Sequence, residues 1–254
     1  MRLPRRLGHG ESAELVDHLG ELRSRLLVAG LAVLVASGVA FAFHEQLIEL
    51  LNRPLPEGRR KPVTLGVTEP FMTSLKVSLA AGFAVALPVV LWQVWGFLAP
   101  AFQRGIQRAV AALVTFGALL FAGGVAFSYF FVLPAAIRFL TTYDSDVYDI
   151  EVRASHYYSF VLASLLAVGL IFQLPVAVLG VVRLGLLTSA KLRRNRRIGY
   201  VAMAATAVVL PGVDPVSTAL TMLPLICLFE ASIWLAVVFE KRWGLVGAPA
   251  GEPA

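Results

Sequence analysis

Long runs of uncharged, mostly apolar residues constrain this chain more than any other feature. The first covers residues 26–43, where all 18 side chains are uncharged. About 20 helical residues cross a hydrocarbon core of about 30 Å, so this run is just long enough to span it. Of the 254 residues, 58% are hydrophobic and 15% are charged, whereas a soluble domain carries about 25% charged residues. We therefore expect an integral membrane protein.

Six apolar segments predict an all-α fold with six transmembrane helices. They lie at residues 26–43, 77–98, 109–133, 157–182, 198–210 and 216–239. The fifth has only 13 residues, and Glu230 interrupts the sixth after 14. We therefore expect the last two helices to be short, and either to thin the bilayer locally or to bury their ends in protein. Structural roles are assigned to Pro54, Pro88 and Pro175, because proline cannot continue a helix without disturbance.

The polar segments predict the topology. Residues 1–13 are expected to be a basic flexible N-terminus, residues 14–243 the membrane domain with an external cap at 44–73, and residues 244–254 a disordered tail. Six spans put both termini on one side of the membrane. That side carries 15 lysines and arginines and the opposite side seven. By the positive-inside rule, both termini are cytoplasmic.

No motif in the sequence indicates catalysis. The four histidines have no zinc-ligand spacing, and the sequence contains neither a phosphate-binding loop nor a nucleophile elbow. The single cysteine, Cys227, excludes an internal disulfide. The basic residues are not interleaved with aromatic residues as a nucleic-acid groove requires. We therefore expect no enzyme, no metal, no cofactor and no nucleic-acid partner.

A charged amphipathic helix is predicted directly before the first span. Its leucines recur at positions 15, 19, 22 and 26, which form one stripe. Glu14, Asp17 and Glu21 form another stripe, and Arg25 follows Glu21 by four residues, so the two can pair. Two interpretations stay open at this point. The helix is either a solvated anchor at the membrane surface or a site whose carboxylates bind a cationic partner.

Three polar residues stand out within or beside the last three spans. Glu230 is either a functional intramembrane acid or a residue that reaches the headgroups. Gln173 either hydrogen-bonds between helices or lines a wet concavity. Asp214, beside Pro215, is most simply a turn residue.

Several short motifs, taken in their order along the chain, resemble the TatC family, the multi-span component of the twin-arginine protein translocase. Residues 18–26 read HLGELRSRL and residues 87–100 read LPVVLWQVWGFLAP. The remaining matches are Pro54 with Leu55, FQLP at 172–175, a PGVD turn at 211–214 and CLFE at 227–230. The resemblance covers residues 14–242.

The resemblance implies a receptor in the bacterial or archaeal cytoplasmic membrane that binds the twin-arginine signal peptides of folded proteins. It also implies TatA-like and TatB-like single-span partners, self-association, and export driven by the proton-motive force. Carried over residue by residue, Glu21 would contact the paired arginines, and the positions that shape or neighbour this site are Arg23, Gln93 and Phe97. Asp17, on the same predicted helix, would supply a further carboxylate to the site. The polar positions for partner docking would be Gln173, Asp214, Thr218 and Glu230.

The sequence departs from the family pattern at three positions. Ile106 stands where a second recognition glutamate is usual, Gln173 where span four usually has a glutamate, and Thr218 where a glutamine is common. These departures fit a divergent paralogue with altered signal recognition. A secondary transporter of a small solute or ion is the alternative, supported by Glu230 and Gln173 but not by any internal repeat.

Overall fold

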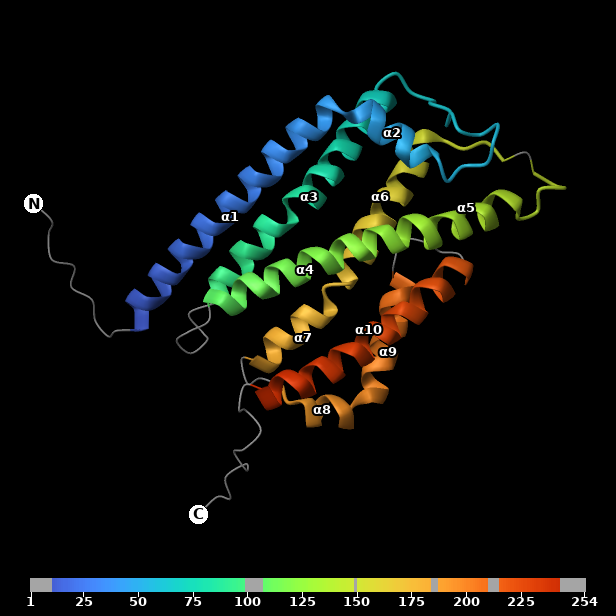
Figure 1. Cartoon of the computed structure of the whole chain (residues 1–254). Coiled ribbons are helices and arrows are strands. Elements are labelled where there is room, and N and C mark those ends of the chain that lie inside the picture. The colour runs from blue at the N-terminus through green and yellow to red at the C-terminus, as the bar shows by residue number, and fades with distance from the viewer. Residues whose placement is uncertain (1–10, 99–106, 149, 184–186, 210–214, 243–254) are drawn as a thin grey trace, which may run out of the picture.

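The computed structural model describes residues 11–98, 107–148, 150–183, 187–209 and 215–242, and the named elements in these ranges are all helices (Figure 1). This confirms the all-α fold class. In chain order the elements are α1 (Glu11–Ala42), α2 (His44–Asn52), α3 (Glu69–Leu98), α4 (Gln107–Phe127), the π-helical turn η2 (Ser128–Val132), α5 (Leu133–Thr142), α6 (Ala154–Ile171), α7 (Leu174–Arg183), α8 (Ser189–Arg194), α9 (Arg196–Val209) and α10 (Pro215–Arg242). The predicted tail, residues 244–254, lies outside the described residues, as do residues 1–10 of the predicted N-terminus.

Five helical segments in the described part of the chain are long and apolar enough to cross a membrane, at residues 19–42, 69–98, 111–142, 154–183 and 218–240. Helix α9, with 14 residues, is the short one, reaching about 21 Å. The expectation that the last helix is also short is wrong, because α10 has 28 residues and continues through Glu230. The polar partners of Glu230 on α9 offset the cost of a carboxylate within this span.

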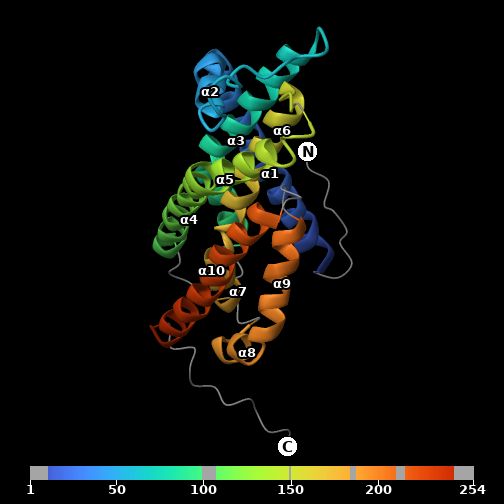
Figure 2. The same cartoon turned by 90° about the vertical axis from the view of Figure 1, so that its right-hand side faces the viewer.

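The helices have a common polarity (Figures 1 and 2). The starts of α1 and α4 and the ends of α3, α7 and α10 lie toward one end, together with α8. We call this the cytoplasmic end, from the charge distribution. Helix α2, the end of α5 and the start of α6 lie at the other, external end. Helices α1 and α3 run antiparallel, side by side.

The third span was predicted to end at residue 133, directly before Pro134, but it continues further. The helix passes through η2 into α5 and ends at Thr142, with Pro134 in the first turn of α5. Pro134 has no N–H group to donate to the preceding turn, so one carbonyl of that turn lacks its usual helical partner. The π-helical turn directly before it shifts the hydrogen-bond pattern and lets the chain continue.

The fourth span is broken rather than continuous. Helix α6 ends at Ile171 and α7 begins at Leu174, so Phe172 and Gln173 lie at the break. Pro175 explains the break, because it cannot donate to the carbonyl of Ile171 and its ring crowds that carbonyl. Pro88, in contrast, lies inside the unbroken helix α3.

The external cap is a folded unit that contains more helix than predicted. Helix α2 fills its first part, and α3 already begins at Glu69, with Pro70 in its first turn. Pro54 follows the end of α2, and Leu55 beside it is buried. The loop after α2 pairs through Val63 with the segment before α6.

The largest buried apolar cluster lies in the external half of the molecule. It joins α2, α3, α5 and α6 through the side chains of Leu51, Leu55, Val77, Leu133, Ile137, Ala154, Tyr157, Tyr158, Val161 and Leu165. Beside it, the buried carboxylate of Glu69 accepts hydrogen bonds from the backbone N–H groups of Leu65 and Ser155, both at 2.9 Å, and from Arg153. The external half is therefore the well-packed part of the fold.

Candidate functional site

An ion pair lies near the cytoplasmic end of α1. The Nε and Nη2 atoms of Arg25 both donate to Oε1 of Glu21, at 2.8 and 2.6 Å. The predicted pairing of these two residues across one helical turn is confirmed. Their side chains are 35% exposed for Glu21 and 27% exposed for Arg25, so solvent reaches both.

Arg25 also connects this ion pair to α3. Its Nη1 atom donates to Oε1 of Gln93, at 3.4 Å. Gly96, one turn further along α3, makes room for the guanidinium, because a Cβ atom at this position would collide with Nη1. Glu21 and Gln93, which the sequence assigned to one site, are therefore linked through a residue that the sequence did not assign to it.

The other predicted residues of this site are placed less closely. Arg23 is exposed on α1, and Phe97 is half-buried near the end of α3. The side chain of Asp17 and all of Ile106 lie outside the described part of the structure. Sequence reasoning missed Arg25 and Gly96 as site residues, although the four-residue spacing from Glu21 was a signal for Arg25.

Glu230 connects α9 and α10. Its Oε2 atom pairs with Nη2 of Arg196 at 3.0 Å, and its Oε1 atom accepts a hydrogen bond from the hydroxyl of Tyr200 at 2.5 Å. One turn from Arg196, Gly199 lies so close to the ring of Phe229 that a side chain would not fit. These contacts support a role in helix packing, a reading of Glu230 that the sequence did not offer.

Gln173 also makes a contact between helices. Its Nε2 atom donates to the backbone carbonyl of Gly117 on α4, at 2.8 Å. This supports the interpretation of Gln173 as a helix-joining residue. Thr218 is half-buried near the start of α10, and Asp214 lies outside the described residues. Gln173 and Glu230 contact α4 and α9, not the Glu21–Arg25 ion pair.

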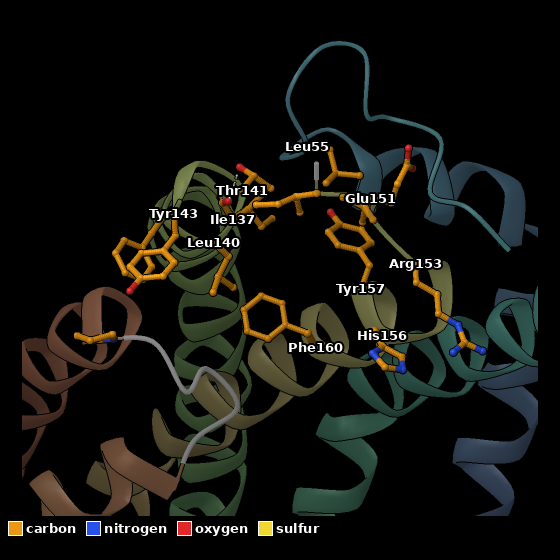
Figure 3. A pocket seen from close by; sticks show the side chains of 14 residues that line it. Leu55, Ile137, Leu140, Thr141, Tyr143, Glu151, Arg153, His156, Tyr157 and Phe160 are labelled. Carbon is orange, nitrogen blue, oxygen red and sulfur yellow. Dashed lines mark hydrogen bonds between the residues drawn. The ribbon is translucent and has the colours of Figure 1, made fainter. Parts of the chain in front are cut away.

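A cavity of about 710 Å³ opens at the external end, between α5 and α6 (Figure 3). Phe160 and Tyr157 of α6 and Leu140 of α5 line it, and Arg153 and His156 lie along one side. Its lining is mainly apolar. Among the residues that the structure describes, no group of three or more His, Cys, Asp or Glu side chains could hold a metal ion.

The chemistry of the Glu21 cluster is that of cation binding. A carboxylate pairs most strongly with a guanidinium, whose planar N–H groups match its oxygens. The cluster offers an anionic group, the amide of Gln93 and partial access to solvent. It is therefore the best candidate for a functional site in the described structure.

Comparisons with known proteins give one consistent result. The family model of the Sec-independent protein translocase protein (TatC) matches residues 17–224. A protein of that name from Carboxydothermus hydrogenoformans is 32% identical over 229 residues, covering 90% of this chain and 94% of its own length. The protein of that name from Aquifex aeolicus is 35% identical over 233 residues, covering 90% and 96%. A crystal structure of the twin-arginine translocase receptor TatC in DDM matches with a TM-score of 0.77 at 34% identity, covering 86% of this chain and 99% of that one.

Proposed function

Because this chain belongs to the TatC family of Sec-independent protein translocase proteins, we propose that it is the receptor subunit of a twin-arginine translocase and binds the paired arginines of signal peptides through Glu21. The family is one of six-span inner-membrane proteins that serve protein transport and are not enzymes. The alternative of a small-solute transporter has no support from these relatives.

The observation that carries the proposal is the ion pair of Glu21 with Arg25. Its half-exposed carboxylate already binds one guanidinium, that of Arg25, in a short, charge-assisted contact. A site that holds an arginine of its own chain has the geometry to hold an arginine of another. Its place near the cytoplasmic end is where an export signal arrives. Gln93 would offer a further acceptor, and Arg23, Phe97 and Asp17 would border the bound peptide.

We further propose that single-span TatA-like and TatB-like subunits dock on α9 and α10. Helix α9 is the shortest span, and Val201 and Val208 on it are exposed. Thr218 and Asp214, beside the turn between the two helices, would add polar contacts. Glu230 and Gln173 are engaged within the chain, which argues that they hold the helices in place for such partners rather than contact them. Self-association and a divergent signal preference, suggested by Ile106, belong to the same proposal.

The test is the substitution Glu21→Gln in the full-length chain, which keeps the size of the side chain and removes its charge. Hydrogen bonds to charged groups are worth about 1.5–3 kcal/mol, so we expect a synthetic twin-arginine signal peptide to bind about 10- to 100-fold more weakly in detergent. Export of a folded reporter in cells that lack their own receptor should fall in parallel. Glu49→Gln, an exposed glutamate on α2 at the external end, is the matched control and should bind normally. Normal binding by the Glu21 variant would place recognition elsewhere.

A further inference from the structure

The carboxylate proposed to recognise signal arginines is already occupied. Arg25 directs two of its nitrogens, Nε and Nη2, at the same oxygen of Glu21, at 2.8 and 2.6 Å. On its other side, Nη1 reaches Gln93, and the absence of a side chain at Gly96 gives the guanidinium space against α3. A signal arginine would therefore meet a carboxylate that holds a guanidinium in place.

Arg25 has two advantages over an arriving peptide. It lies one turn from Glu21 on the same helix, so its effective concentration at the carboxylate is far above that of a dilute peptide. It also adds a positive charge. This charge partly neutralises the carboxylate of Glu21, so a cationic peptide gains less attraction to it while Arg25 stays.

We propose that Arg25 is a resident competitor that a signal peptide displaces from Glu21, and that this competition lowers the affinity of the site for signal peptides. This inference rests on the proposed function. On displacement, Arg25 keeps its place beside Gln93 and Gly96, while the signal guanidinium takes over Oε1 of Glu21. The contact that Arg25 gives up offsets part of the contact that the signal arginine gains, so the peptide binds more weakly than it would to a free carboxylate.

A lysine competes less well for Glu21. An ammonium group is compact and strongly hydrated, and it cannot reproduce the planar contact that Arg25 makes. The preference for arginine therefore comes from the carboxylate, whereas Arg25 lowers the affinity of every peptide that displaces it by the same factor. Arg25 acts here through Glu21, as a residue that sets the affinity of the site.

The experiment compares Arg25→Gln with the unaltered full-length chain, using three synthetic signal peptides that carry Arg-Arg, Lys-Arg or Lys-Lys. Removing the competitor should tighten binding of the Arg-Arg peptide about two- to fivefold, the range that a partly exposed ion pair is worth. The lysine peptides should gain by at most the same factor, because removing Arg25 does not help a peptide that binds without displacing it. The ratio of Arg-Arg to Lys-Lys affinity should therefore stay the same or rise. Arg25→Lys keeps the charge without the planar group and should lie between the two proteins.

Arg194→Gln is the charge control, because Arg194 is an exposed residue of α8 toward the same end. It should change all three affinities by less than Arg25→Gln does, because it removes a positive charge without freeing Glu21. Weaker or unchanged binding of the Arg-Arg peptide by Arg25→Gln, or the same gain in the Arg194 variant, would overturn the competition. If Glu21→Gln loses binding while Arg25→Gln gains none, the proposed function stands and only this inference fails. If Glu21→Gln binds normally, the proposed function itself fails.

Discussion

At the scale of single residues, tyrosine hydroxyls hold the end of α2. The last carbonyls of a helix have no partner within it, and a helix of nine residues is marginal by itself. Tyr157 donates to the carbonyl of Leu51 at 2.6 Å, and Tyr129 donates to that of Leu50 at 2.8 Å. The external cap is thus stabilised by side chains from two transmembrane helices.

The substitution Tyr157→Phe tests this arrangement. It removes only the hydroxyl and leaves the buried carbonyl of Leu51 without this donor, so we expect a loss of about 1–3 kcal/mol in the free energy of unfolding. Thermal unfolding of the purified chain in detergent measures the change. Tyr148→Phe is the control, because Tyr148 is 65% exposed and its replacement should have little effect. Equal melting temperatures for the two variants would show that the bond to Leu51 contributes nothing.

Residue pairs were predictable only within one helix. The contact of Glu21 with Arg25 follows from their spacing, because helical periodicity places such residues side by side. The contact of Arg25 with Gln93 joins residues 68 positions apart, and periodicity carries no information across that separation. For the same reason, the sequence suggested that Gln173 joins helices but did not identify Gly117 as its partner. In both cases a glycine on the facing helix allows the close approach.

At the scale of elements, the prolines show that the sequence does not decide whether a proline interrupts a helix. Pro88 and Pro224 lie inside continuous helices, Pro134 follows a π-helical turn, and Pro175 lies just after a break. The local chemistry is the same in all four. The outcome depends on whether neighbouring groups or local rewinding satisfy the freed carbonyl, and these are properties of tertiary packing.

The contact between α3 and α7 yields a prediction at the same scale. Gly180 of α7 faces the ring of Trp95, where an added Cβ would overlap the indole, and Trp95 is only 5% exposed. A buried ring cannot move aside cheaply, so Gly180→Ala should destabilise the chain by about 1–3 kcal/mol. Thermal unfolding in detergent would measure this.

Gly123 of α4 is the control position for Gly180→Ala. A Cβ at Gly123 meets nothing within 4 Å, so Gly123→Ala should be neutral or stabilising by up to about 1 kcal/mol through helix propensity. Destabilisation of similar size in both variants would mean that the packing against Trp95 is not the cause.

At the scale of the whole molecule, hydropathy and charge predicted the class and topology because both are sums over many residues. The five long spans and the short α9 follow from apolar length. The length of α10 was mispredicted because Glu230 was read as an interruption, although Arg196 and Tyr200 bind it. The concentration of the buried core at the external end was not predictable, because it depends on which helices meet.

The short α9 gives the molecule one span that does not match a bilayer. At about 21 Å, it requires the membrane to thin beside it or its ends to be covered by protein. If thinning helps a folded protein to cross, inserting four apolar residues after Ala205 should reduce export of a twin-arginine reporter at least several-fold, because α9 then reaches about 27 Å. Arg196 and Tyr200 precede the insertion, so their contacts with Glu230 are kept. Signal-peptide binding should stay within about twofold, because Glu21 lies on another helix, which separates a defect in transport from one in recognition. The same insertion after Asp146, in an exposed external loop, controls for chain length. Full export by the lengthened α9 would show that its shortness has no part in transport.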